Sequence, residues 1–319
     1  MPITRLLVVR LGAMGDILHA LPAAAALKRS WPGCHLAWAV HPRWRDLLEG
    51  GGVADELIEI DRHRLGSVLS AFRRLRAGRF DFAIDFQGLI KSASVCFAAH
   101  APLRYGFERA LLREPAAALL YNRRFPATGV HVVDRNLALA RHAGAAAGPI
   151  EFPLPPGRAE GNLPDGPFVL ASPLAGWTSK QWPLESWSEF ASLLHGQTPY
   201  RLVFNGSPAA AAWARSVPGS ILHVSSIAGL IDATRRATAI VGLDSGPLHL
   251  AAALSKPGVA LFGPTDASRN GPYSDSLRVL RSPGAETSYA RLDHIHPSMH
   301  ALTPSAVFRA LIDLLESTR

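Results

Sequence analysis

Residues 6–28 constrain the fold of this chain more than any other segment. Residues 6–9 form a short apolar run, as expected for the first strand of a buried parallel sheet. Gly12 and Gly15 mark a turn that ends at Asp16, and apolar side chains then recur at helical spacing. A strand, a glycine turn and a helix in this order predict an α/β domain whose helix N-terminus points at a ligand.

Asp16 has two interpretations. Aspartate is a favoured helix cap, so Asp16 can simply satisfy backbone amides at the start of the helix. Pro22 removes a hydrogen bond unless it lies in the first helical turn, which favours a helix start near Leu18. A start at Leu18 would leave the Asp16 carboxylate free to face a ligand as a catalytic base.

The glycine turn does not match a dinucleotide-binding fingerprint. That fingerprint requires G-x-G-x-x-G, whereas Gly12 and Gly15 stand three positions apart. The expected second strand, residues 36–40, ends in His41 and offers no acid to bind a ribose. These two features argue against a nicotinamide-dependent dehydrogenase.

The overall composition bounds the size, compartment and partners. A chain of 319 residues is long enough for two domains, and 48% hydrophobic residues suffice for two cores. Cys34 and Cys96 show neither metal-ligand nor disulfide spacing, which favours a reducing cytoplasm. No apolar run reaches the ~18 residues of a membrane span. The net charge of +8 predicts an acidic partner, but no nucleic-acid-binding motif is present.

Strand and helix signals alternate along the chain. We expect strands at residues 6–9, 36–40, 56–60, 82–86, 168–172, 201–204, 221–224, 239–241 and 259–262. We expect helices at residues 43–49, 65–75, 89–100, 187–194, 227–236 and 304–317, and an alanine-rich helix after Gly206. The Pro- and Gly-rich segment 149–167 separates the halves, so we place the domains at 1–155 and 156–319. Two α/β halves predict twin Rossmann-like domains with a cleft between them.

Polar residues follow the strand at 82–86. Asp85 and Gln87 lie at its carboxyl end, the edge of a parallel sheet that faces ligands, where they are suited to grip sugar hydroxyls. Equally, they are suited to cap the next helix. The following segment, 104–135, carries few strand signals but many basic residues, which predict an anion-binding wall unless Glu108 and Glu114 neutralise them. These basic residues are Arg109, Arg113, Arg123, Arg124, His131 and Arg135.

The second half contains the best anion site of the chain, at residues 244–249. Ser245 is placed to cap a helix that starts at Pro247, and Gly246 lets the backbone approach a ligand closely. The helix N-terminus suits a diphosphate, to which His249 and the loop residue Lys180 add donors. An ordinary capped helix and a solvated lysine are the alternatives.

Seven short motifs, spread over the whole chain, occur in the order that is typical of one protein family. They are GAMGDILHALPA, DFQGLIKSA, LREP, YNRRF, SKQWP, GLDSGPLHLAAAL and LFGPTD. Together they closely resemble the bacterial lipopolysaccharide heptosyltransferases of glycosyltransferase family 9, especially those that add the first heptose to the Kdo of the inner core.

The resemblance implies a GT-B fold with a central cleft, an acceptor-binding domain at 1–155 and a nucleotide-sugar-binding domain at 156–319. It leaves open that the final helix packs back on the first domain. The implied donor is ADP-L-glycero-D-manno-heptose, and the implied acceptor is the anionic Kdo-lipid A. Transfer inverts the anomeric centre without a metal or other cofactor. We expect a monomer in the cytoplasm, peripheral to the inner membrane, that binds no nucleic acid.

The resemblance also assigns roles to individual residues. Asp16 matches the catalytic base and Lys180 the lysine that contacts the donor phosphate. The donor-binding turn is matched by Asp244, Ser245, Gly246 and His249. The acceptor side is assigned Gly15, Asp85, Gln87, Arg113, His131 and Arg135.

Two departures weaken the assignment of the donor. Ala175 and Gly176 stand where relatives often carry hydroxyl residues, and the segment after Gly206 lacks the glutamate that holds the ribose. Three other functions are alternatives: a family 9 transferase with another donor or acceptor (a later heptose, or Kdo), a GT-B-like epimerase, and a non-catalytic protein that binds lipopolysaccharide precursors. The arginines of segment 104–135 favour a large anionic acceptor and argue against the epimerase.

Overall fold

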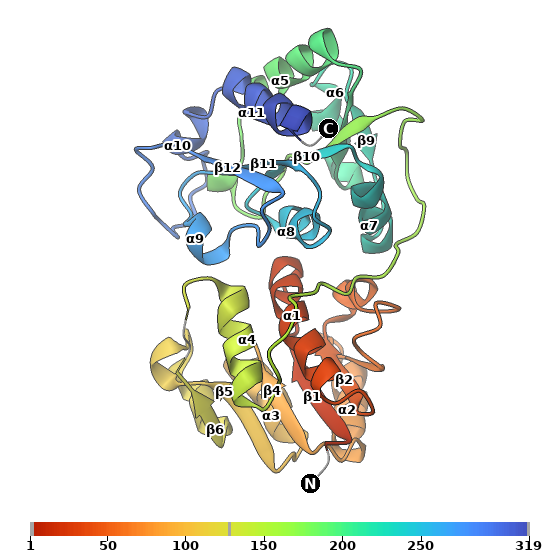
Figure 1. The fold of residues 1–319 in the computed structure, drawn as a ribbon, viewed down its shortest axis with the longest axis vertical. Helices are drawn as coiled ribbons and strands as arrows, with labels where there is room; N and C mark the ends of the chain where they lie inside the picture. Colours follow the sequence, from red (N-terminus) through yellow and green to blue (C-terminus); the bar gives the residue numbers. More distant parts are fainter. Residues whose placement is uncertain (1–2, 127–128, 318–319) are drawn as a thin grey trace. The chain divides into compact units, whose positions relative to one another are not determined.

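The chain folds as two α/β units, each built on a six-stranded parallel sheet (Figure 1). The computed structural model describes residues 3–126 and 129–317. The units are Met1–Pro155 and Pro156–Arg319. Within the described ranges, no helix has both the length and the apolar character needed to cross a membrane.

The sheet of the first unit has the strand order β3-β2-β1-β4-β5-β6. Its strands are β1 (Arg5–Val9), β2 (His35–Val40), β3 (Glu56–Glu59), β4 (Phe82–Asp85), β5 (Leu103–Phe107) and β6 (Arg123–Phe125). The four apolar residues of β1, the central strand, are fully buried. Such an apolar run is expected for a strand that is covered on both faces.

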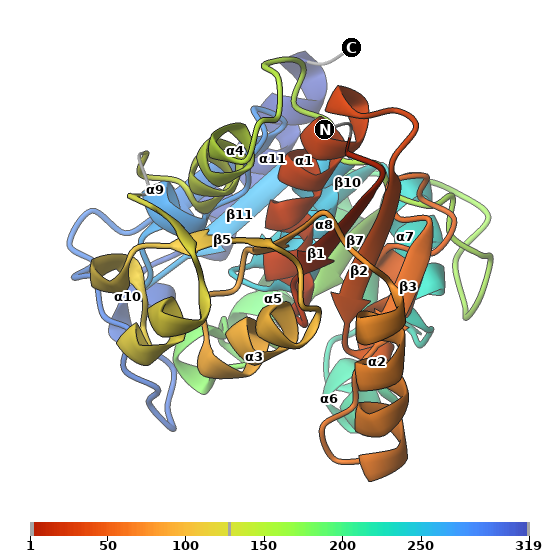
Figure 2. The same ribbon diagram turned by 90° about the horizontal axis from the view of Figure 1, so that it is seen from below.

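Helices cover both faces of this sheet (Figures 1 and 2). On one face, α1 (Met14–Ser30) packs against α4 (Val132–His142). On the other face lie α2 (Leu65–Ala77), α3 (Ile90–Ala98) and the 3-10 turn η3 (Pro115–Leu120). Two further 3-10 turns are η1 (Pro42–Leu47) and η2 (Arg109–Leu111).

The second unit repeats the same arrangement, with strand order β12-β11-β10-β7-β8-β9. Its strands are β7 (Phe168–Ser172), β8 (Arg201–Asn205), β9 (Ile221–His223), β10 (Ala239–Leu243), β11 (Gly258–Phe262) and β12 (Leu277–Arg281). Its helices are α5 (Leu184–Gln197), α6 (Ala211–Arg215), α7 (Ile227–Arg236), α8 (Gly246–Ala253), α9 (Ala267–Asn270), α10 (Pro297–His300) and α11 (Pro304–Ser317), with 3-10 turns η4 (Thr178–Lys180) and η5 (Pro208–Ala210). The final helix, α11, packs against α5 and β11 of its own unit.

Counted along the chain, the strands of each unit follow the order 3-2-1-4-5-6, which is the Rossmann arrangement. The predicted α/β fold with two Rossmann-like domains is therefore confirmed. In such sheets, ligands bind at the carboxyl ends of the strands where the strand order reverses. These switch points lie between β1 and β4 in the first unit and between β7 and β10 in the second.

Three sequence-based expectations are wrong. Segment 104–135 contains most of β5, all of β6 and the start of α4. The two strands gave little sequence signal because they are short, partly exposed and lack an apolar run. Helix α1 begins at Met14 rather than near Leu18, and it contains Pro22. Burial along most of this helix outweighs the hydrogen bond that the proline removes. Residues 43–49 lie largely in the 3-10 turn η1 instead of an α-helix.

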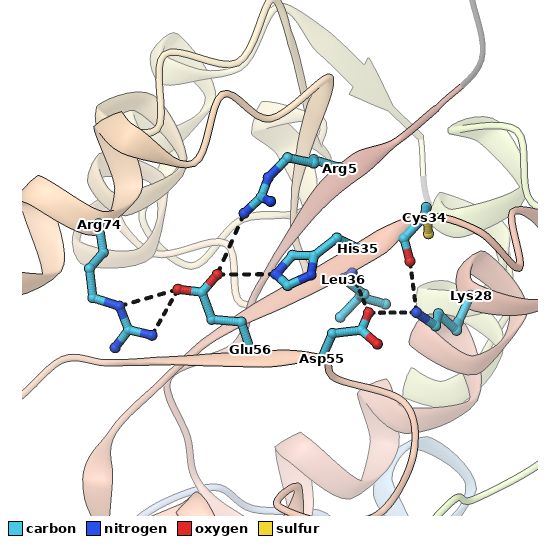
Figure 3. A network of polar contacts seen from close by, with 8 residues as sticks. All are labelled: Arg5, Lys28, Cys34, His35, Leu36, Asp55, Glu56 and Arg74. Carbon is cyan, nitrogen blue, oxygen red and sulfur yellow. Dashed lines mark hydrogen bonds and ion pairs between the residues drawn. The ribbon is translucent and has the colours of Figure 1, made fainter.

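Charged side chains tie together the amino ends of β1, β2 and β3, opposite the ligand-binding edge. Glu56 accepts hydrogen bonds from Arg74 at 2.8 Å and pairs with His35 at 3.1 Å and Arg5 at 3.6 Å. Because Arg74 belongs to α2, the network also anchors this helix to the sheet. Figure 3 shows these contacts beside a second group, in which Lys28 and the Leu36 N–H donate to Asp55 and Lys28 also donates to the Cys34 carbonyl oxygen.

Candidate active site

A pocket of about 590 Å³ opens at the switch point of the first unit. This volume lies in the range of small-molecule sites. Its walls come from the turn after β1, the turns after β2, β3 and β4, and the helices α2 and α3. The lining residues are Leu11, Gly12, Ala13, Asp16, His41, Arg43, Trp44, Ile60, Arg62, His63, Val68, Phe72, Gln87, Leu89, Lys91, Ser94 and Val95.

Asp16 lies in the first turn of α1, and its side chain is 47% exposed at the pocket. Its Oδ2 atom accepts a hydrogen bond from the Ala13 N–H at 3.0 Å. A full capping box would also need the side chain of Ala13 to accept a hydrogen bond from the Asp16 N–H, and alanine has no acceptor. Only the contact from the Asp16 carboxylate is therefore present. The Asp16 carboxylate therefore stabilises the helix start and also faces the pocket. The two interpretations drawn from the sequence, a helix cap and a group that faces a ligand, are compatible.

Arg10, which the sequence reasoning missed, holds this carboxylate. The guanidinium is buried, and its Nη2 atom lies 2.7 Å from Oδ1 of Asp16. Its Nη1 atom donates to the Phe86 carbonyl oxygen at 2.5 Å, so the residue after β4 fixes the residue after β1. A charged residue directly after the apolar run of residues 6–9 is the sequence signal that could have identified Arg10.

Gln87 and Asp85 stand two residues apart but have different environments. Gln87 lines the pocket and accepts a hydrogen bond from the Leu11 N–H at 3.0 Å. Asp85 is 0% exposed and accepts hydrogen bonds from the Tyr121 hydroxyl and the Gln87 N–H, each at 2.7 Å. Burial raises the pKa of the Asp85 carboxyl, although the hydrogen bond from Tyr121 acts in the opposite direction. Asp85 thus shapes the loop that presents Gln87, the structural role that the sequence left open, and does not reach the pocket surface.

The pocket carries more basic groups than the sequence analysis assigned to it. Arg43 lies with its guanidinium 4.8 Å from the centre of the Trp44 ring. Such a set of arginine, lysine and histidine side chains suits an anionic ligand. The basic lining residues are His41, Arg43, Arg62, His63 and Lys91.

The other residues assigned to the acceptor lie outside the group of described residues that lines this pocket. Gly15 belongs to the first turn of α1. His131 caps α4 by accepting from the Val133 N–H at 3.1 Å, and Arg135 donates to the Gly129 carbonyl oxygen at 3.0 Å. Arg113 is exposed between η2 and η3.

The second unit pairs a cation and a carboxylate at its own switch point. Lys180 follows β7, Asp244 follows β10, and the Nζ and Oδ2 atoms lie 2.5 Å apart. The Thr265 hydroxyl donates to the same oxygen at 2.7 Å, and Nε2 of His249 lies 3.9 Å from Oδ1. The structure therefore brings together the lysine and the turn that the sequence proposed for the donor.

The start of α8 differs from the expected capped helix. The helix begins at Gly246, one residue before Pro247. Ser245 occupies the N-cap position, but its side chain makes no capping hydrogen bond. Its Oγ atom is buried without a hydrogen-bond partner in the parts of the chain that the structure describes. Because a buried hydroxyl without a partner is unfavourable, this atom is suited to bind a ligand at the helix N-terminus.

Trp177 is contacted by two cations, a feature that the sequence reasoning did not find. Nζ of Lys180 is 4.2 Å from the centre of the Trp177 ring, and the guanidinium carbon of Arg291 is 4.9 Å from it. Arg291 has no ion pair within the ranges described. The Trp177 ring thus places a second positive charge, that of Arg291, near Lys180. Among the described residues, no cluster of three or more His, Cys, Asp or Glu side chains is arranged to hold a metal ion.

Comparisons with known proteins agree with this architecture. A family model described as "Glycosyltransferase family 9 (heptosyltransferase)" matches residues 68–297. Lipopolysaccharide heptosyltransferase 1 of Escherichia coli O18:K1:H7 is 28% identical, over 89% of this chain and 93% of that protein. Lipopolysaccharide heptosyltransferase 2 of Salmonella typhimurium is 28% identical, over 98% of both chains. The structure of E. coli heptosyltransferase WaaC with ADP-2-deoxy-2-fluoro heptose is 25% identical, with a TM-score of 0.79 over 99% of this chain and 100% of that one.

Proposed function

Because the chain belongs to glycosyltransferase family 9, we propose that this glycosyltransferase moves L-glycero-D-manno-heptose from ADP-heptose to the Kdo of lipopolysaccharide inner core. The observation that carries the proposal is the Asp16 carboxylate, held by Arg10 at the mouth of a basic pocket. Relatives named as lipopolysaccharide heptosyltransferases and a solved relative with an ADP-heptose analogue support the choice of acceptor and donor.

In the proposed reaction, Asp16 accepts the proton of an acceptor hydroxyl while that oxygen attacks the anomeric carbon of the donor. The bond to the diphosphate breaks on the opposite face, so the configuration inverts. Arg10 occupies one carboxylate oxygen and the Ala13 N–H the other, which sets the direction of the remaining lone pairs. The basic lining of the pocket suits the carboxylate of Kdo and the phosphates of lipid A.

We assign the donor to the second unit. The N-terminus of α8 and the Ser245 hydroxyl offer hydrogen bonds to a diphosphate. Asp244 already balances the charge of Lys180, so a donor with two phosphate charges needs another cation, and Arg291 beside Trp177 is placed to supply it. These groups stabilise the departing ADP, which is the contribution that a metal makes in other transferases. Transfer further requires the two units to bring Asp16 and the donor within reach of one another.

Two features support a second candidate reaction. A heptosyltransferase 1 and a heptosyltransferase 2 are each 28% identical to the chain, and Ala175 and Gly176 replace the hydroxyl residues expected near the donor. A later heptose or a Kdo residue is therefore the alternative transfer. We further propose a monomer in the cytoplasm that works at the inner membrane surface.

Incubation with ADP-heptose and Kdo-bearing lipid A, followed by mass spectrometry, tests the proposal. We expect the acceptor to gain one heptose and ADP to be released in equal amount. An Asp16→Asn enzyme serves as the matched control. Thermal stabilisation by ADP without turnover of any ADP-sugar would instead indicate a non-catalytic binding protein.

A further inference from the structure

Helix α2 exposes a stripe of large apolar side chains. Leu65 is 81% exposed, Leu69 58% and Phe72 39%. These positions are spaced four and three residues apart, so they share one side of the helix. A different side, with Ala71 and Leu75, is buried against the sheet. Single exposed leucines are ordinary, but a contiguous apolar stripe marks an interaction surface.

Helix α2 and the residues just before and after it carry an excess of positive charge. Residues 62–80 contain six arginines and neither aspartate nor glutamate. Arg74 is neutralised by Glu56, and Arg64 lies 3.5 Å from Asp61. The other four have no ion pair in the part of the chain that the structure describes. They are Arg62, Arg73, Arg76 and Arg79.

The stripe is continuous with the pocket of the first unit. Phe72 belongs to the stripe and also lines the pocket that contains Asp16, as does Val68 on the same helix. Helices α2 and α3 lie in contact on one face of the sheet (Figures 1 and 2), and α3 exposes Ile90 and Phe97. The exposed apolar stripe of α2 thus reaches the wall of the pocket that contains Asp16.

We propose that α2 docks on an anionic lipid bilayer, with Leu65, Leu69 and Phe72 between the lipid headgroups and the unpaired arginines on the lipid phosphates. An apolar stripe flanked by arginines is the pattern of helices that lie in a membrane interface. A nucleic acid would use the arginines but has no place for exposed leucines. The docking itself is independent of the chemistry. Only its purpose, access to a lipid-anchored acceptor, rests on the proposed function.

The experiment is co-sedimentation of the full chain with vesicles of phosphatidylglycerol and phosphatidylethanolamine, compared with vesicles of phosphatidylcholine alone. We expect binding to the anionic vesicles that weakens as salt is raised, because the arginine contacts are screened. A Leu65→Ser/Leu69→Ser variant should bind about tenfold more weakly, and Arg73→Gln/Arg76→Gln should lose most of the salt dependence. Val279→Ser, at an exposed apolar residue on β12 of the second unit, is the matched control and should bind like the natural chain.

Measuring heptose transfer to a water-soluble and to a vesicle-bound acceptor distinguishes the docking proposal from the proposed function. Leu65→Ser/Leu69→Ser should keep full turnover on a delipidated, water-soluble acceptor and lose it on the same acceptor presented in vesicles. Vesicle binding without heptose transfer would contradict the proposed function but would still support the docking surface. Equal binding of the natural chain to both vesicle types, unchanged binding of both variants, or binding to RNA in place of vesicles would overturn the docking surface.

Discussion

Arg10 and Asp16 form an ion pair of 2.7 Å across the glycine turn that follows β1. The arginine is buried and fixed by the Phe86 carbonyl oxygen, whereas the aspartate is half-exposed at the pocket. A rigid cation behind a half-exposed carboxylate orients the carboxylate before any ligand binds. Such preorganisation is what a general base requires, because misplacement of a reacting group by about 1 Å is costly.

Replacing Asp16 by Asn should abolish base catalysis while keeping the shape of the helix start. We expect kcat to fall about 100- to 10,000-fold, because this is the usual contribution of a positioned base. The affinity for ADP should stay unchanged, since we assign donor binding to the second unit. Steady-state kinetics and ADP calorimetry measure the two quantities, with Asp313→Asn on α11 as the control. Full turnover of Asp16→Asn would remove the carboxylate from the mechanism.

Arg10 should act through Asp16 as a positioning residue. Arg10→Lys has one ammonium in place of a fork and cannot hold both Asp16 and the Phe86 carbonyl oxygen, so we expect kcat to fall about tenfold with the donor KM unchanged. In an Asp16→Asn background the same change should have little further effect on kcat. Additive losses of kcat in the double variant would show that Arg10 acts independently of Asp16.

Lys180 and Asp244 should be energetically coupled in donor binding. Lys180→Met should raise the donor KM roughly 10- to 100-fold, the value of a hydrogen bond to a charged group. Asp244→Asn removes the ion-pair partner of Lys180. The effect of Asp244→Asn on the donor KM should therefore differ between chains with Lys180 and chains that carry Lys180→Met. A double-mutant cycle on the donor KM measures this coupling. Independent effects of the two changes would contradict the pairing seen at 2.5 Å.

Arg291 should contribute to donor binding through the face of Trp177. We expect Arg291→Ala to raise the donor KM several-fold, because the arginine is exposed and stacked rather than enclosed. The rise should shrink at high salt, and kcat should change little. Arg309→Ala on α11 is the matched control for loss of one exposed charge. A donor KM equal in Arg291→Ala and in the control would exclude this role.

Glu56 should make the stability of the first unit sensitive to acid. Burial alone raises the pKa of Glu56, but hydrogen bonds from Arg74 and His35 outweigh it and hold the pKa below its ordinary value of 4.5. A lowered pKa contributes stability above pH 4.5, and this contribution is lost as the pH falls through the folded-state pKa. Glu56→Gln should therefore lower Tm by roughly 2–4 °C near neutral pH, and the difference should shrink as the pH falls from 4.5 through the folded-state pKa of Glu56. Thermal melts across this range measure it, and a difference independent of pH would point to packing instead of charge.

Elements that bury an apolar run were predictable from the sequence. The strand at Phe168–Ser172 and the helices at Ile227–Arg236 and Pro304–Ser317 lie where the residue pattern placed them. The edge strands β6 and β12 escaped prediction, because half of an edge strand faces solvent and its residues carry no periodic apolar signal. Helix α1 shows the converse, since burial holds Pro22 inside a helix that local preference would end.

The sequence by itself determined which short segments offer chemistry: the turn with Asp16, the turn at residues 244–249, and the loop with Lys180. These are local signals, because a turn, a cap and a helix start depend on neighbouring residues. Only the tertiary structure decided that Arg10 holds Asp16, that Asp85 is buried while Gln87 faces the pocket, and that Lys180 meets Asp244 from 64 positions away. The physical reason is the reversal of strand order in each sheet: it places β1 beside β4 and β7 beside β10, so loops distant in sequence end at one edge.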